Sequence, residues 1–182
     1  ANGMNGWPYY ADSGLILYNT TNPRIDNNHF VKNYNEGVLV FNTWNASIEN
    51  NTVLGGSVGF RLFASNESIL VNNGIDNVSE GINLVGSTRC IMADNHIISR
   101  FFGVSSSSSN NTIIGNNVSV TEGTGISLWR ADDNLIENNT ISAGRGIELF
   151  ESNYARIGSN RFFNESAVDI VLESSRVIGI EN

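Results

Sequence analysis

The chain has 182 residues, a formal net charge of −8 at pH 7 and only 15% charged residues. It contains 29 Asn, 21 Ser and 18 Gly but a single Lys, Lys32, so neither a strongly helical fold nor nucleic-acid binding is expected, because Asn, Ser and Gly disfavour helix interiors and phosphate binding needs cations. Its 19 Ile, with abundant Val, Leu and Phe, argue against disorder. No run of 18 apolar residues is present to span a membrane, and a single cysteine, Cys90, excludes an internal disulfide.

The chain repeats itself along its whole length, with two independent markers that keep step. One marker is an Asn followed two residues later by an apolar residue, and the other is a Gly followed directly by one; both recur every 21 to 23 residues. The Asn markers are Asn5, Asn28, Asn51, Asn73, Asn95, Asn116, Asn139 and Asn160. The Gly markers are Gly14, Gly37, Gly59, Gly81, Gly103, Gly125 and Gly146, with Ala167 in the last place.

Apolar residues alternate with polar ones around both markers, which is typical of short β-strands. A unit of this length cannot bury its apolar side alone, whereas stacked copies can. The pattern therefore predicts an all-β fold, a right-handed parallel β-helix of about eight coils of 21–23 residues, forming a single domain over residues 1–182. In such a stack the Asn amides lie about 4.8 Å apart and can hydrogen-bond to one another. The Gly positions indicate a bend that needs either a positive φ or a close backbone approach.

Three segments also resemble a known family: "SIENNTV" (residues 47–53), "NNTIIGNNV" (110–118) and "NLIENNTISAGRGIELFES" (134–152). They are similar to the parallel β-helix repeat family, which is related to pectate lyases and includes NosD-like proteins and carbohydrate-binding and sugar-hydrolase domains. The resemblance covers nearly the whole chain and implies the β-helix fold. Because the matching residues are core and turn positions, it does not specify an activity.

Two carboxylates fall in an outward column of the predicted long strands. Counting from the Gly markers places Glu148 and Asp169 on adjacent coils, roughly 5 Å apart. This spacing suits a paired-carboxylate glycosidase or a Ca²⁺ site, while the alternative is a pair of solvated acids on a polar face. No other cofactor is expected, and the lyase-like combination of acidic, histidine and basic clusters is absent.

A second outward column is rich in aromatic residues. Exposed rings in register suit stacking on sugars or burial against a partner; the alternative is that the strand bends and the rings tuck under a turn. Arg130 and Arg145 border this column near its aromatic residues. The column contains Tyr18, Phe41, Phe63, Val85, Ser107, Trp129, Phe150 and Val171.

The resemblance to NosD-like proteins raises copper binding, which the residues do not favour. His29 and His96 lie three coils apart, about 14 Å, and are too distant to share an ion. By alternation Cys90 and Met92 point into the core. No metal site is therefore predicted.

The run Ser105–Ser109 places Ser106 at a core position otherwise filled by Leu-type residues. It indicates either a looser coil that forms a binding dent or a coil that simply tolerates small residues.

Asn-x-Ser/Thr acceptor sites are dense, and most fall on predicted turns where a glycan has access. They favour an N-glycosylated, extracellular or cell-surface protein, archaeal in style. The nine sites are Asn19, Asn45, Asn50, Asn66, Asn77, Asn110, Asn117, Asn138 and Asn164.

The ends of the chain show no obvious cap and no hydrophobic leader, which indicates a processed product or a fragment of a longer β-helix. The alternative is head-to-tail stacking into a filament, with a rise of about 38 Å per subunit.

Taken together, the sequence predicts an extracellular structural or cell-surface scaffold that binds glycans on the aromatic column and has itself, other surface proteins or glycans as partners. The alternative is a polysaccharide lyase, epimerase or glycosidase that uses Glu148 and Asp169. Repeat lengths that vary by only two residues leave little chain to wall a catalytic groove, and this favours the scaffold.

Overall fold

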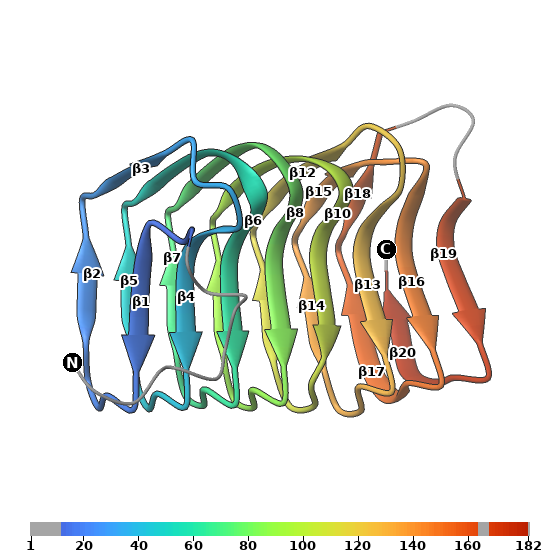
Figure 1. Ribbon diagram of the computed structural model, residues 1–182. Helices are drawn as coiled ribbons and strands as arrows, with labels where there is room; N and C mark the ends of the chain where they lie inside the picture. Colours follow the sequence, from blue (N-terminus) through green and yellow to red (C-terminus); the bar gives the residue numbers. More distant parts are fainter. Residues whose placement is uncertain (1–11, 164–167, 182) are drawn as a thin grey trace.

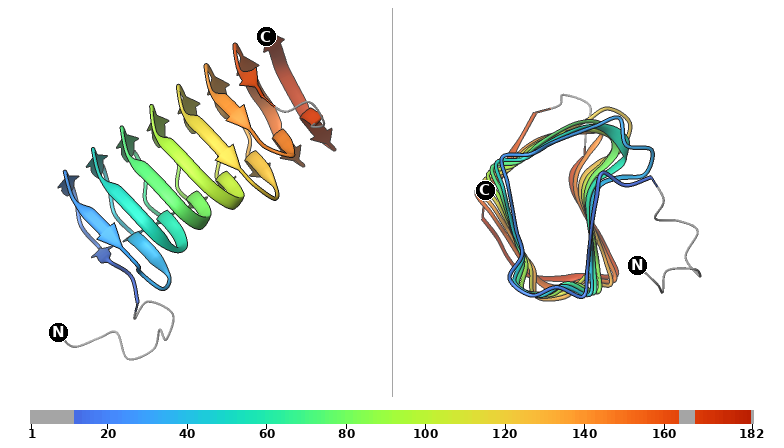
Figure 2. Two further views of the ribbon diagram at one scale, coloured as in Figure 1. Left: turned by 90° about the horizontal axis from the view of Figure 1, so that it is seen from above. Right: turned by 60° about the vertical axis from the view of Figure 1, so that its left-hand side comes forward.

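A computed structural model describes residues 12–163 and 168–181, which form β-strands stacked coil upon coil into a solenoid (Figure 1). Viewed close to its axis, the successive coils superpose on one closed, roughly four-sided outline (Figure 2). Every strand pairs in parallel with the corresponding strand of the next coil, which confirms the predicted right-handed parallel β-helix. Within the described residues no helix has the length and apolar character needed to cross a bilayer.

Two sheets make up the walls. The 8-stranded sheet takes one strand from each coil. Neighbouring strands are one turn of the chain apart, and the whole sheet spans seven turns. Its strands are β2 (Arg24–Asp26), β5 (Ser47–Glu49), β7 (Ile69–Val71), β9 (Ile91–Ala93), β11 (Thr112–Ile114), β14 (Leu135–Glu137), β17 (Asn153–Gly158) and β20 (Arg176–Glu181). The 12-stranded sheet comprises β1 (Leu15–Tyr18), β3 (His29–Val31), β4 (Glu36–Phe41), β6 (Thr52–Phe63), β8 (Gly74–Val85), β10 (His96–Ser107), β12 (Asn117–Val120), β13 (Thr124–Trp129), β15 (Thr140–Ser142), β16 (Arg145–Phe150), β18 (Arg161–Phe162) and β19 (Val168–Glu173).

The core is a set of apolar columns that run the length of the solenoid. In the 8-stranded sheet the middle residue of each short strand points inward, as Leu70, Met92 and Ile113 show, and these side chains are fully buried. Facing columns come from the 12-stranded sheet, for example Phe60, Ile82 and Val104 in strict register. Each coil therefore buries its apolar side against its neighbours, as expected for a repeat that cannot do so alone.

The Asn column forms a continuous hydrogen-bonded ladder. Asn95 accepts through Oδ1 from the main-chain N and from Nδ2 of Asn73, each at 3.0 Å, and donates through Nδ2 to Leu70 O and Asn116 Oδ1, each at 2.9 Å. The same pattern recurs from Asn28 to Asn160. The ladder residues from Asn51 to Asn139 are each no more than 1% exposed. The ladder therefore satisfies polar groups that water cannot reach.

The Gly column marks a close approach between coils, not a left-handed bend. A Cβ on Gly103 would lie 2.2 Å from Val118 Cγ1 and 2.5 Å from Gly125 O. Positive φ angles occur instead at the corners of the coils, and Asn supplies ten of the 21 described non-Gly residues in this conformation, for example Asn27, Asn50 and Asn72. Asn tolerates this conformation better than most residues, so corner geometry adds to the Asn content that the ladder requires.

The last coil departs from the register that the sequence analysis expected. Ile147 pairs with Ile170 and Glu148 pairs with Val171, so two additional residues lie between β18 and β19 compared with the preceding coil. Gly146 consequently faces Asp169, while Ala167, expected there, lies outside the described residues, as do Asn5 and Asn164. A fixed count from the previous marker cannot detect such an insertion.

Candidate functional site

An aromatic column lies on the outer face of the 12-stranded sheet, at the C-terminal ends of its long strands. Its members are in register from coil to coil, and Tyr18, Phe63 and Trp129 are 49%, 39% and 54% exposed. The prediction that this column points outward is confirmed at these positions. The structure also corrects its last member, because Phe150 pairs with Glu173 and not with Val171.

The rings stack in two groups. Tyr18, Phe41 and Phe63 form one group, with centroids 5.4 and 5.1 Å apart and interplanar angles of 17° and 3°. Trp129 and Phe150 form the other, with centroids 4.5 Å apart and an interplanar angle of 37°. Parallel strands in register bring such rings to van der Waals distance, so the rings of each group pack against one another on the outside of the sheet.

A polar column runs beside the rings, two residues earlier on each strand. Near its centre Asn83 Nδ2 donates to Ser105 Oγ at 2.7 Å and to Glu80 Oε2 at 3.2 Å, and Ser105 Oγ donates to the same Glu80 oxygen at 3.2 Å. All three side chains are half-buried. We call Glu80, Asn83 and Ser105 the amide–hydroxyl cluster.

Three arginines near the polar and aromatic columns are neutralised by glutamates. Arg61 Nη1 lies 3.3 Å from Glu36 Oε1, and Arg145 Nη1 lies 3.1 Å from Glu148 Oε1. Arg130, which follows Trp129, pairs with Glu151. Arg130 and Arg145, which the sequence analysis expected beside the aromatic column, are therefore both partners in ion pairs.

The predicted carboxylate pair is not formed. Glu148 lies opposite Ser127 and Val171, and its two oxygens accept hydrogen bonds from Arg145 and Thr124 at 3.1 and 3.2 Å. Asp169 is displaced by two residues along its strand, to the level of Gly146, and is exposed. The expectation of two acids on adjacent rungs of one column, as a glycosidase pair or Ca²⁺ site, is therefore wrong, for the register reason given above.

Among the described residues, the side chains that could bind a soft metal are not gathered in one place. Cys90 and Met92 both point into the core and are fully buried, and burial raises the pKa of the Cys90 thiol from 9.0 to about 11. His29 and His96 are exposed in one column with two rungs, Thr52 and Gly74, between them. Within residues 12–163 and 168–181 no three His, Cys, Asp or Glu residues come together as metal ligands.

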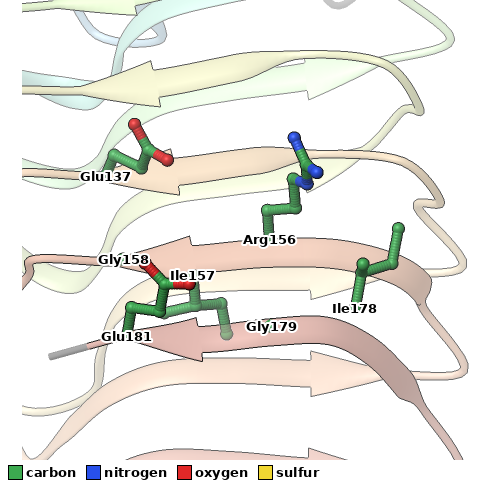
Figure 3. Close-up of a pocket in the computed structure, with 7 residues that line it drawn as sticks. All are labelled: Glu137, Arg156, Ile157, Gly158, Ile178, Gly179 and Glu181. Atoms are coloured by element: carbon green, nitrogen blue, oxygen red, sulfur yellow. The ribbon is translucent and has the colours of Figure 1, made fainter.

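A shallow pocket of about 280 Å³ lies elsewhere, on the outer face of the 8-stranded sheet near its C-terminal end (Figure 3). Glu137, Arg156 and Glu181 surround it, and Gly158 and Gly179 leave room between them. The sequence analysis did not identify these residues. Their only common signal is that Gly158 and Gly179 interrupt two neighbouring outward columns, one with Glu137 and Glu181 and the other with Arg156.

The acceptor sites for glycans are mostly exposed. Seven of the eight described sites are exposed, whereas Asn66 is half-buried and its Oδ1 accepts two hydrogen bonds from Thr88. Six of the eight have a positive φ, so corner geometry by itself accounts for part of their abundance.

Solved structures similar to this chain include an epimerase and an adhesin. The periplasmic alginate epimerase AlgG superposes with a TM-score of 0.70 at 18% identity, covering 92% of this chain and 48% of AlgG. The Streptococcus pneumoniae surface protein and adhesin PfbA superposes with a TM-score of 0.60 at 14% identity, covering 91% of this chain and 63% of PfbA. At these identities the likeness shows the fold, and the chain spans about half the length of AlgG.

No curated protein sequence matches the chain significantly. The sequence profile of NosD, described as a periplasmic copper-binding protein, matches residues 7–78 and 63–182, which together include nearly the whole chain. The repeat, the Asn ladder and this match agree, and the chain belongs to the NosD family of parallel β-helix proteins.

Proposed function

We propose that this chain is a glycan-binding β-helix that works outside the cytoplasm, with the aromatic column as its binding surface. The observation that carries the proposal is the set of outward rings held in register on one face, with Trp129 54% exposed. Large exposed rings that are not buried against the core are expected where a protein meets a ligand or partner.

The comparisons support the setting of this proposal. The family is described as periplasmic, AlgG is a periplasmic enzyme on alginate, and PfbA is a surface adhesin. A glycan-related role at the cell envelope is consistent with all three. N-glycosylation at the exposed acceptor sites, and stacking of copies or surface partners along the solenoid axis, belong to the same proposal.

We favour binding over catalysis because of the state of the carboxylates. Glu148 is engaged by Arg145 and Thr124, and Asp169 lies at another level of the sheet. A glycosidase needs two carboxyl groups on opposite sides of one bond. The fold shared with an epimerase keeps a polysaccharide-active enzyme as the second candidate, to be tested by assaying the chain and its Glu148→Gln variant for polymer cleavage or epimerisation.

The described residues do not fit the copper centre that the family description suggests. Copper(I) prefers thiolate and thioether ligands, but Cys90 and Met92 lie in the core, and the Cys90 pKa of about 11 keeps the thiol protonated at neutral pH. His29 and His96 lie three rungs apart, about 14 Å. No step of the proposed function therefore uses copper.

The experiment is affinity electrophoresis of the purified chain through gels that contain single polysaccharides. Trp129→Ala and Phe150→Ala are expected to weaken retardation by about tenfold or more, equivalent to about 1.4 kcal/mol. Tyr154→Ala is the matched control, because Tyr154 is 50% exposed but belongs to the 8-stranded sheet. A chain that no polysaccharide retards, or variants that all behave alike, would overturn the proposal.

Glycosylation and assembly need the natively sourced protein. Intact mass well above 19.8 kDa would show occupied acceptor sites. Electron microscopy of the same sample would show whether copies stack end to end, and discrete particles of unmodified mass would remove both features.

A further inference from the structure

The aromatic column is interrupted at its centre. Between Phe63 and Trp129 two rungs carry Val85 and Ser107 instead of rings. Three steps of about 4.8 Å separate the two rings, so their Cα atoms lie about 14 Å apart. We call the two rungs with Val85 and Ser107 the break.

Among the described residues, the rings at the edges of the break have another ring on one face only. Phe41 is covered on both sides by Tyr18 and Phe63 and is half-buried, whereas Phe63 and Trp129 are 39% and 54% exposed. Because the stacks run along the solenoid axis, the sides of Phe63 and Trp129 that look toward the break have no ring stacked on them and adjoin only the shorter side chains of Val85 and Ser107. A sugar ring binds an aromatic ring face to face, so within the stacks only such uncovered faces can take a sugar.

The amide–hydroxyl cluster lies beside the break on the same two rungs. Asn83 precedes Val85 and Ser105 precedes Ser107 by two residues, so both side chains share the outer face of the sheet. Glu80 accepts from Asn83 and Ser105 through Oε2, and Oε1 takes no part in these bonds. A carboxylate and an amide are strong partners for sugar hydroxyl groups.

The charge around the break is unfavourable for acidic sugars. Arg61, Arg130 and Arg145 are each paired with a glutamate, and Glu80 and Glu173 add negative charge to the face. A polymer with a carboxylate on every residue would meet these acids beside the aromatic column, where Arg61, Arg130 and Arg145 are already engaged by glutamates. The whole chain, at −8, repels polyanions as well.

We infer that the break is the sugar-binding subsite and that it takes uncharged polysaccharides; this inference rests on the proposed function and makes it more specific. The sugar rings stack on the sides of Phe63 and Trp129 that look toward the break, and their hydroxyl groups hydrogen-bond to the amide–hydroxyl cluster. The stacking direction makes the bound chain cross the solenoid axis. The fold shared with an alginate epimerase would by itself suggest a uronate polymer as ligand. The charge of the polymer therefore distinguishes that expectation from the neutral polysaccharide inferred here.

The decisive test adds an aromatic ring instead of removing one. Ser107→Phe extends the Trp129 stack into the break and covers its free face, so binding of neutral polymers should fall by about tenfold or more. If exposed aromatic area alone determined binding, the same variant would bind more tightly. Ser107→Ala keeps the break open and should bind within about twofold of the parent. Val85→Phe repeats the test from the Phe63 side if Ser107→Phe does not fold, as judged by thermal unfolding.

The probes are soluble β-glucan, mannan and xylan as neutral polymers, with alginate and polygalacturonate as uronate counterparts, at low and at physiological ionic strength. Retention by a neutral polymer that is lost in Trp129→Ala and in Ser107→Phe supports the inference. Retention that Trp129→Ala abolishes but Ser107→Phe preserves or strengthens overturns the break as subsite while the proposed function stands. Tighter binding of a uronate than of every neutral polymer overturns the ligand class, and a chain that binds none of the polymers overturns the inference together with the proposed function.

Discussion

The buried Asn ladder and the exposed aromatic column are built in the same way, from one side chain repeated in register on successive coils. Inside, every rung from Asn51 to Asn139 is occupied by Asn, is at most 1% exposed and is hydrogen-bonded to its neighbours. Outside, the column is interrupted by Val85 and Ser107. A buried column must be continuous, because a missing amide would leave polar groups without a partner and away from water. A solvent-exposed column can lose members without loss of the fold.

Removal of one amide from the interior ladder is expected to have the largest effect. Asn95→Ala leaves the buried N–H of Asn73 and the carbonyl of Leu70 without their side-chain partner, at a cost of about 3 to 5 kcal/mol in the free energy of unfolding. Urea unfolding measures it. The exposed Asn117→Ala should change the same free energy by about 0.5 kcal/mol or less, and equal effects at both sites would remove the distinction between interior and exterior.

The next effect concerns the close approach of coils at the Gly column. In Gly103→Ala the new methyl group meets Val118 Cγ1 and the carbonyl oxygen of Gly125, and the backbone oxygen cannot turn aside. Overpacking of this kind should destabilise the chain by about 2 to 3 kcal/mol in thermal or urea unfolding. At Gly179 a Cβ has no atom within 4 Å, so Gly179→Ala should be neutral or slightly stabilising. Comparable losses would contradict the assigned role of Gly103.

A pH titration extends the comparison to the core. Burial raises the pKa of Cys90 from 9.0 to about 11, so between these values the unfolded chain releases a proton that the folded chain retains. Stability should therefore fall as the pH rises from about 9 to about 11. The Cys90→Ala variant lacks this contribution, and its stability should fall less over the same range in urea unfolding. Identical slopes for the two proteins would show that the thiol titrates normally.

The smallest stability effect is expected outside. Trp129→Ala removes an exposed ring and should change the free energy of unfolding by about 1 kcal/mol, most of it the contact with Phe150. A double-mutant cycle with Phe150→Ala measures that contact, with about 0.5 to 1.5 kcal/mol of coupling expected. A loss as large as that of Asn95→Ala would mean that the aromatic column supports the fold and is not free to serve binding.

The regular spacing of the sequence was sufficient to predict the fold, the ladder and the direction of the outer column. These features depend on period alone, because in-register stacking brings residues one period apart into contact. The predicted carboxylate pair failed at Asp169 for the converse reason, since two additional residues before β19 shift every later partner. The sequence analysis did not predict the corner residues with positive φ, such as Asn27 and Glu67. It assigned a role to the Asn residues of the ladder only and did not consider that other Asn residues form the corners.

The repeat pattern of the sequence is enough to establish that this chain stacks into a β-helix, that Asn95 and its equivalents lie inside, and that Trp129 and Phe63 lie outside. The three-dimensional arrangement was needed to learn which rings stack on one another, that Arg61, Arg130 and Arg145 are neutralised, and that Glu148 has no acidic partner on the next rung. The physical reason is that a period fixes which residues are neighbours between coils, whereas pairing of long side chains depends on rotamers, on offsets of two or three residues within a coil and on local insertions, which the period does not contain.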